Sequence, residues 1–205
     1  MRPDKYIEGA FEDLRRALEK LRTESEKTLV DMARVILKAF RGRHKLFCFG
    51  NGGSAADAQH IAAEFVNKFR LERPPFPAIA LTTDTSILTS VSNDRSFSDV
   101  FVRQLGALAE AGDVALGLST SGRSENVVRA LRWAREHGLY TLGLSGPDKT
   151  DMDVYCDLIV HVPIANTPRI QECHIFLAHL ICGMVEILYM EETSGDLDSP
   201  GLQQC

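Results

Sequence analysis

The spacing of apolar residues changes from a helical to a strand-like pattern near residue 45. Apolar side chains recur at steps of three and four over residues 4–22 and 27–40, which predicts two helices. Short continuous apolar runs follow, and runs of this kind are typical of buried strands. The predicted strands are 46–49, 78–81, 114–118, 140–144 and 158–162. The predicted helices between and after them are 54–69, 97–110, 124–137 and 167 to about 190.

Alternating strands and helices predict an α/β fold, in which helices cover both faces of a parallel sheet. A chain of 205 residues is expected to form one domain. We place this domain at residues 1–192, including an N-terminal helical segment at 1–42, and expect the polar residues 193–205 to form a flexible tail. The two N-terminal helices have broad apolar faces. They either cover the sheet or form a subunit interface, and we favour the interface.

A glycine-rich segment, Gly50-Asn51-Gly52-Gly53-Ser54, joins the first strand to the helix after it, and we call it the glycine turn. The glycines are expected to take positive φ and to direct backbone N–H groups inward. Ser54 is expected to cap the helix, with Asp57 completing a capping box. A strand, such a turn and a helix N-terminus in this order form an anion site, most often for phosphate.

The glycine turn has three interpretations. Gly50, Gly52 and Ala55 match the dinucleotide-binding fingerprint. However, the acid expected about 20 residues later could only be Glu72, which precedes a proline-rich loop instead of closing a second strand. A Walker loop is excluded, because no Gly-Lys-Ser/Thr follows. The third interpretation is a small phosphorylated ligand held by main-chain N–H groups and hydroxyls.

A second polar segment, Ser119–Ser124, ends the third predicted strand, and we call it the hydroxyl turn. One such turn is usually only a capped loop, but two turns after parallel strands favour one shared phosphorylated ligand. Neutral hydroxyls and amides bind a phosphomonoester without requiring a basic chain. Thr82–Ser86 and Asn93-Asp94 follow the second strand, and they either bind sugar hydroxyls or serve as helix caps and turns.

Side chains from remote parts of the chain are candidates for one metal site. His60 and Glu64 stand at i and i+4 on one helix face. The final helix is apolar over most of its circumference, so we expect it to be buried; it carries Gln171 and His179. These two lie about 12 Å apart along the axis and about 80° around it, so both reach one ion only with difficulty. We therefore expect helices to converge there, from more than one subunit. Otherwise His179 is a core residue.

The composition of the chain limits which classes of partner and which cellular compartment we expect. The net charge of −5 gives no general attraction to nucleic acid or anionic membranes, and we expect neither as a partner. No run approaches the roughly 18 apolar residues of a membrane span, and residues 1–5 lack the apolar run of a signal peptide. The 5 cysteines form no CxxC pair, so we expect free buried thiols in a reducing cytoplasm.

These motifs together resemble those of the phosphoheptose isomerases, members of the sugar isomerase (SIS) domain superfamily. The resemblance covers nearly the whole chain, to about residue 190. Its motifs are Gly50-Asn-Gly-Gly-Ser-Ala-Ala-Asp-Ala-Gln-His60, Leu81-Thr-Thr-Asp-Thr-Ser86, Asn93-Asp94, Ser119-Thr-Ser-Gly-Arg-Ser124 and Arg169-Ile-Gln-Glu-x-His174, with His179 beyond. Arg123 departs from the family, which commonly has Asn there. Its side chain either reinforces phosphate binding or points to solvent or a neighbouring subunit.

The resemblance implies a flavodoxin-like three-layer α/β sandwich with a five-stranded parallel sheet, assembled as a homotetramer. It implies an aldose–ketose isomerase that converts sedoheptulose 7-phosphate to D-glycero-D-manno-heptose 7-phosphate, toward nucleotide-heptoses for surface glycans such as lipopolysaccharide. It implies one zinc ion per subunit, with ligands at His60, Glu64, Gln171 and His179. Glu64 and His179 fall on the family's acid/base pair. The expected substrate-binding residues are Asn51, Gly52, Gly53, Ser54, Glu64, Asn93, Asp94, Ser119, Thr120, Ser121, Ser124 and Gln171.

Two alternatives remain. One is a non-catalytic SIS protein that binds the DnaA replication initiator. From the resemblance, that group departs from the isomerase pattern in the glycine turn, the hydroxyl turn and the second histidine of the last helix, whereas this chain retains all three. The other is an isomerase or binder of a different sugar phosphate.

Overall fold

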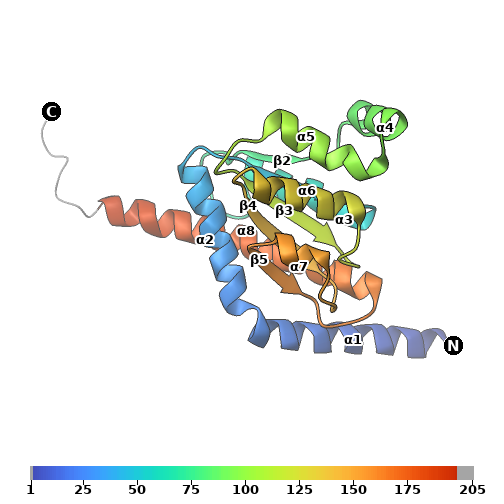
Figure 1. Cartoon of the computed structure of the whole chain (residues 1–205). Coiled ribbons are helices and arrows are strands. Elements are labelled where there is room, and N and C mark those ends of the chain that lie inside the picture. The colour runs from blue at the N-terminus through green and yellow to red at the C-terminus, as the bar shows by residue number, and fades with distance from the viewer. Residues whose placement is uncertain (1, 198–205) are drawn as a thin grey trace, which may run out of the picture.

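Five parallel strands form one sheet at the centre of the computed structural model, which describes residues 2–197 (Figure 1). The order across the sheet is β2-β1-β3-β4-β5, and every neighbouring pair is parallel. The strands are β1 (Leu46–Gly50), β2 (Ala78–Ala80), β3 (Val114–Ser119), β4 (Tyr140–Ser145) and β5 (Leu158–His161). All five predicted strands are therefore confirmed.

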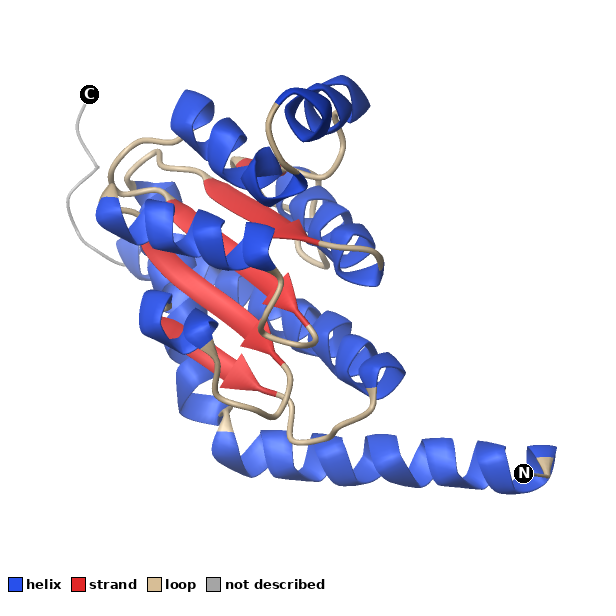
Figure 2. Cartoon of the chain, turned by 45° about the vertical axis from the view of Figure 1, so that its right-hand side comes forward, coloured by secondary structure: helices blue, strands red, loops and turns tan. Residues whose placement is uncertain are grey.

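Helices cover both faces of the sheet, so the predicted three-layer sandwich is confirmed (Figure 2). One layer contains α1 (Pro3–Glu24), α2 (Glu26–Arg41), α3 (Gly53–Val66) and α8 (Thr167–Leu197). The other contains α5 (Val100–Leu108), α6 (Glu125–Glu136) and α7 (Asp151–Tyr155). Helix α4 (Thr85–Asp94) and the 3-10 helix η1 (Phe97–Asp99) precede α5. α4 has no buried residue and projects at the upper right of Figure 1.

The central strands β1, β3 and β4 are buried on both faces along almost their whole length, which explains why they read as continuous apolar runs. In β1, Leu46 and Cys48 join the core under α2, α3 and α8, whereas Phe47 and Phe49 join the core under α5 and α6. The predicted buried free thiols are confirmed for Cys48, Cys156, Cys173 and Cys182, and Cys205 lies outside the described residues.

Two helices were not predicted. α4 has the sequence TSILTSVSND, whose β-branched and hydroxyl residues are weak helix formers. Asp84 caps α4, because its carboxylate accepts a 2.9 Å hydrogen bond from Ile87 N–H, which supports the capping interpretation of that residue. α7 has only 5 residues, too few for a helical period to be visible in the sequence. The predicted helix at 97–110 begins as η1 and continues as α5 to Leu108.

The glycine turn differs from its prediction in two ways. Only Gly52 has a positive φ, of 55°, while Gly50 and Gly53 do not. Gly50 is instead required by close packing, since a Cβ there would lie 2.8 Å from the Leu118 carbonyl oxygen. Gly52, not Ser54, occupies the N-cap position of α3, so the predicted capping box with Asp57 is wrong. The helix begins one residue earlier than predicted, and it ends at Val66 instead of residue 69.

Helix α8 continues to Leu197, into the predicted tail, and residues 198–205 lie outside the described residues. Contrary to the expectation from sequence, the stretch Thr167–Thr193 is long and apolar enough, by length and composition alone, to span a membrane. However, α8 packs against α2 and α3 as a core helix. Only one face is buried, because Phe176, Leu180 and Ile187 on the other face are exposed. The helix is apolar over most of its circumference, as predicted, but its predicted burial holds for one face only.

Candidate active site

The glycine turn and the hydroxyl turn lie side by side at the carboxyl edge of the sheet. β1 and β3 are neighbours, with Gly50 in register with Leu118. Asn51 of the glycine turn pairs with Asn126, which lies in α6 just after the hydroxyl turn, because each side-chain amide donates a 2.8 Å hydrogen bond to the other. The N-termini of α3 and α6 both start at this edge, which lies at the switch point of strand order, where such sheets bind ligands. Two helix N-termini there favour an anion.

The side chains of the hydroxyl turn converge. Ser119 Oγ lies 3.1 Å from Ser124 Oγ and 3.4 Å from Ser121 Oγ. The backbone N–H of Gly122 donates to Ser119 Oγ at 3.1 Å, and Gly122 has a φ of 65°. Thr120 is half-buried beside them. Three hydroxyls, two of them within hydrogen-bond range of Ser119 Oγ, can donate jointly to the oxygens of one phosphate group.

Two histidines and a glutamate meet where α3 contacts α8. The Nε2 atoms of His60 and His179 are 2.9 Å apart. His60 Nε2 also lies 3.3 Å from Glu64 Oε1, one turn along α3. The ring of Phe69 stacks on His179, with centroids 5.3 Å apart. The structure thus brings together His60, Glu64 and His179 within a single chain.

The donor set fits a divalent metal. Imidazole nitrogen and carboxylate oxygen are zinc ligands, with Zn–N distances of about 2.0–2.1 Å. Two nitrogens on a tetrahedral ion at that distance are about 3.3 Å apart, a few tenths of an ångström more than the 2.9 Å between the two Nε2 atoms. Small side-chain rotations therefore suffice for both imidazoles to bind one ion.

Gln171, the fourth predicted ligand, comes from α8. It lies beside Gly53 and Asp57 of α3, which precede His60 by about two turns and one turn of that helix. A Cβ on Gly53 would be 2.3 Å from Gln171 Nε2, so glycine at this position leaves room for the amide. Gln171 also contacts Asp57, which is buried with one carboxylate oxygen lacking a partner. Burial raises the pKa of Asp57, against the opposing effects of the Gln171 hydrogen bond and the nearby His60. The sequence pattern predicts Asp57 only as part of a helix cap, and no local signal places it beside Gln171.

The structure does not link Asn93 and Asp94 to either turn. Both are exposed at the end of α4, where Asn93 Nδ2 donates to Asp94 Oδ1. Among the described residues, no hydrogen bond connects this pair to the glycine turn or the hydroxyl turn. Arg123 is largely exposed, and its guanidinium lies 3.7 Å from the Asp148 carboxylate. Their roles in substrate binding stay predictions.

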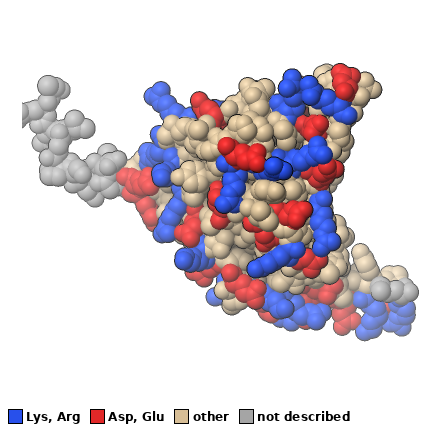
Figure 3. Space-filling view, in the orientation of Figure 1, with Lys and Arg blue, Asp and Glu red and all other residues tan. Residues whose placement is uncertain are grey.

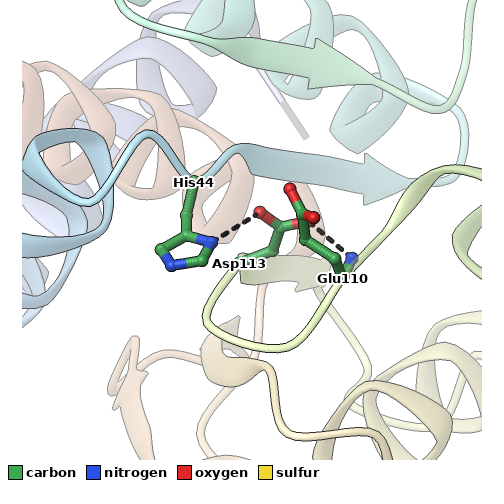
Figure 4. Close-up of side chains that lie close together, drawn as sticks. All are labelled: His44, Glu110 and Asp113. Atoms are coloured by element: carbon green, nitrogen blue, oxygen red, sulfur yellow. Dashed lines mark hydrogen bonds and ion pairs between the residues drawn. The ribbon is translucent and has the colours of Figure 1, made fainter.

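A second group that could hold a metal consists of His44, Glu110 and Asp113, at the opposite, amino edge of the sheet (Figure 4). Asp113 accepts hydrogen bonds from the backbone N–H groups of Lys45 and Glu110, at 2.7 and 2.8 Å. The Lys45 ammonium lies 2.7 Å from Glu110 and 3.4 Å from Asp113, so it already offsets one of the two negative charges of this group. We therefore assign the group a structural role.

Positive and negative side chains are interspersed on the face shown in Figure 3, with no extended patch of one sign. This distribution agrees with a net charge of −5. The anion site at the sheet edge consequently depends on local hydroxyls and backbone N–H groups more than on a broad positive field.

Comparisons with known proteins show what this fold and sequence are similar to. A family model described as the SIS domain matches residues 11–146. The phosphoheptose isomerase of Nitratidesulfovibrio vulgaris is 48% identical, with 90% of this chain and 88% of the relative covered. The phosphoheptose isomerase of Pelobacter propionicus is 53% identical, with 84% and 92% covered. The solved structure of phosphoheptose isomerase GmhA from Neisseria gonorrhoeae has a TM-score of 0.85 and 37% identity, with 90% and 99% covered.

Proposed function

The chain belongs to the phosphoheptose isomerase family of SIS-domain proteins, and we propose that it interconverts sedoheptulose 7-phosphate and D-glycero-D-manno-heptose 7-phosphate. Membership of this family makes the protein an aldose–ketose isomerase with a phosphorylated heptose as substrate. Its product would enter nucleotide-heptose biosynthesis in the cytoplasm.

One observation carries this proposal. Glu64 and His179 come from helices far apart in the sequence, yet both contact His60. The α3 helix, which carries Glu64, begins in the glycine turn, and Asn51 of that turn pairs with Asn126, just after the hydroxyl turn. In our proposal, this carboxylate and imidazole act on one end of a sugar whose phosphate, at the other end, is held by the two turns. This is the arrangement that isomerisation of an open-chain sugar phosphate needs.

The reaction moves one proton between C1 and C2 and another between O1 and O2. In our proposal, Glu64 removes the proton from one carbon and returns it to the other. His179 transfers the proton between the two oxygens, because an imidazole can donate and accept near neutral pH. The hydroxyl turn, with Ser119, Ser121 and Ser124, holds the phosphate at the far end of the sugar and fixes the position of C1 and C2. Gly52, Gly53 and Ser54, from the glycine turn, line the substrate site next to the hydroxyl turn.

We propose zinc as the metal, bound by His60, Glu64, His179 and Gln171, one ion per subunit. This proposal is supported by the distance between His60 Nε2 and His179 Nε2, which is close to that between two nitrogen ligands of one zinc ion. It is also supported by the donor types, imidazole nitrogen and carboxylate oxygen. A bound divalent ion would supply a Lewis acid that polarises the substrate carbonyl and orients the sugar. Glu64 and His179 are each a proposed ligand and a proposed proton carrier, so the two roles compete for the Glu64 carboxylate oxygens and for His179 Nε2.

Replacing Glu64 with Gln tests the proposal. The amide keeps the size of the side chain but cannot take a proton, so we expect kcat to fall by about 10²–10⁴-fold with the fold intact. Glu136→Gln is the matched control, because Glu136 is an exposed residue of α6 that pairs with Arg132. Activity of Glu64→Gln within tenfold of wild type would remove Glu64 from the role of base.

We also propose that the chain assembles as a homotetramer. α1 extends past the body of the domain and carries exposed Tyr6, Ile7 and Phe11 (Figure 1, Figure 2). An apolar groove of about 520 Å³ lies between α1, α2 and α8. A second groove, also of about 520 Å³, includes His179 among its lining residues, so a subunit placed there would close over the site. Exposed apolar patches of this kind mark interfaces.

Light scattering during gel filtration tests the assembly. We expect a mass of four chains for the wild type and a smaller mass for the Phe11→Glu variant. Phe11 is 75% exposed in the single chain, so the substitution should disturb the interface and not the fold. A wild-type mass of one chain at micromolar concentration would contradict the tetramer without bearing on the reaction.

A further inference from the structure

A buried ion pair joins the loop after α3 to helix α8. Arg73 Nε lies 3.1 Å from Glu186 Oε1, and both side chains are 1% exposed. Removing two charges from water is costly, and a buried ion pair is often no more stabilising than apolar groups of the same size. Stability alone therefore does not explain this pair, and its other contacts indicate what it does.

Glu186 organises the loop that follows α3. Its carboxylate accepts hydrogen bonds from three successive backbone N–H groups, those of Phe69, Arg70 and Leu71, at 2.9, 2.9 and 3.0 Å. Burial alone raises the pKa of Glu186, but these N–H groups and Arg73 outweigh it and hold the pKa below its usual value. Glu186 is thus a fixed negative charge around which the loop is built.

Arg73 fixes the end of α3. Its Nη2 donates to the carbonyl oxygen of Glu64 at 2.8 Å, and its Nη1 donates to that of Phe65 at 2.9 Å and that of Asn67 at 3.4 Å. These carbonyls lie at the C-terminus of the helix, where backbone oxygens lack partners and a cation is favourable. The guanidinium therefore sets the position of the turn that carries Glu64.

The same loop contacts the second proposed catalytic group. Phe69, whose N–H binds Glu186, stacks its ring on the imidazole of His179 with an interplanar angle of 25°. Glu186 and His179 are seven residues apart on α8, that is, two turns on one face. The ion pair consequently connects to Glu64 through Arg73 and to His179 through Phe69.

We infer that Arg73 and Glu186 are positioning residues that hold Glu64 and His179 at the separation the reaction requires. This inference rests on the proposed function, which supplies the roles of Glu64 and His179. The pair touches neither reacting atoms nor substrate; it fixes the backbone under Glu64 and the ring against which His179 packs.

Two substitutions test the inference. Glu186→Gln keeps one acceptor oxygen but replaces the other with an amide NH₂ group, which cannot accept hydrogen bonds from the loop N–H groups. Arg73→Lys keeps the charge beside Glu186 but cannot reach the carbonyls of Glu64, Phe65 and Asn67 together. We expect each to lower kcat by about 10- to 100-fold, the effect of displacing a catalytic group by about 1 Å. KM should stay within about threefold, because the phosphate-binding turns are untouched.

Asp113→Asn is the matched control. Asp113 is also a buried carboxylate that accepts backbone N–H groups, but it lies at the opposite edge of the sheet. We expect it to lower the melting temperature while kcat stays within about twofold. If Glu186→Gln fails to fold, the double variant Arg73→Met, Glu186→Met takes its place, because it leaves no unpaired buried charge. Its kcat should fall by the same about 10- to 100-fold.

The inference is overturned if Glu186→Gln and Arg73→Lys lower kcat no more than Asp113→Asn does. A crystal structure of Glu186→Gln separates this outcome from failure of the proposed function. We expect Phe69 to leave the ring of His179, and an unchanged stack would overturn the inference. If the wild type isomerises no heptose phosphate, the proposed function fails, and the structure of the variant alone decides the positioning.

Discussion

Replacing Gly53 with alanine should reduce catalysis without reducing stability. A Cβ at this position would lie 2.3 Å from Nε2 and 2.5 Å from Cδ of Gln171. Ordinary contact between such atoms requires about 3.5 Å, so the Gln171 amide must retreat by about 1 Å. The backbone tolerates the change, because Gly53 begins α3 and has no positive φ. Alanine is also favoured over glycine in helices by up to about 1 kcal/mol.

A displacement of about 1 Å in a group that binds substrate or metal can cost about 10²-fold in rate. We therefore expect kcat/KM for sedoheptulose 7-phosphate to fall by about 10- to 100-fold, which corresponds to about 1.4–2.7 kcal/mol of transition-state stabilisation. The melting temperature should be unchanged or slightly higher. Both quantities are measured on the same preparation, by steady-state kinetics and by differential scanning calorimetry.

Gly9→Ala is the control for this prediction. Gly9 lies in α1, and a Cβ there would meet no atom within 4 Å. The same change of residue in a helix should therefore raise stability slightly and leave kcat/KM unaltered. If Gly53→Ala retains kcat/KM within twofold of both wild type and Gly9→Ala, Gln171 does not act in the site, and the reasoning is refuted.

Three further predictions follow from buried and metal-binding groups. Burial lowers the pKa of His174 to about 4, so the unfolded chain takes up a proton near pH 6.5 and the folded chain does not. Stability should fall by up to about 3 kcal/mol between pH 6.5 and pH 4. Urea unfolding should show this loss in the wild type and a smaller one in His174→Gln. Burial raises the pKa of Cys156 and Cys182 to about 12, so iodoacetamide at pH 8 should modify them only after unfolding, as mass spectrometry would show. Dialysis against a chelator should abolish isomerase activity, and added zinc should restore it. An unchanged rate and melting temperature would show that the metal is dispensable.

Much of the fold could be predicted from the sequence because its apolar runs are unambiguous. The central strands β1 and β3 are buried at every residue, so their apolar runs are continuous and bounded by polar residues, as in Val114–Leu118. The α4 helix could not be predicted, because it buries none of its residues and hence shows no apolar stripe. Its formation depends on the Asp84 cap and on packing against α5 and η1.

The candidate site was predictable only where the residues form local motifs. His60 and Glu64 share a helix face, and the two turns follow strands, so periodicity and topology place them. The Asn51–Asn126 pair links positions 75 residues apart, and Arg73–Glu186 links positions 113 residues apart. No spacing rule in a single sequence relates such partners. The capping prediction for Ser54 was wrong because the positive φ of Gly52 starts α3 one residue earlier.

In our proposal, Glu64 and His179 move protons on a heptose phosphate held by the hydroxyl turn. Proton NMR of the purified protein with sedoheptulose 7-phosphate in D₂O tests it most directly. We predict new anomeric signals of an aldoheptose phosphate, with solvent deuterium entering on carbon during turnover in the wild type, and neither change with Glu64→Gln. An unchanged ketose spectrum with folded, zinc-loaded wild-type protein would contradict the account.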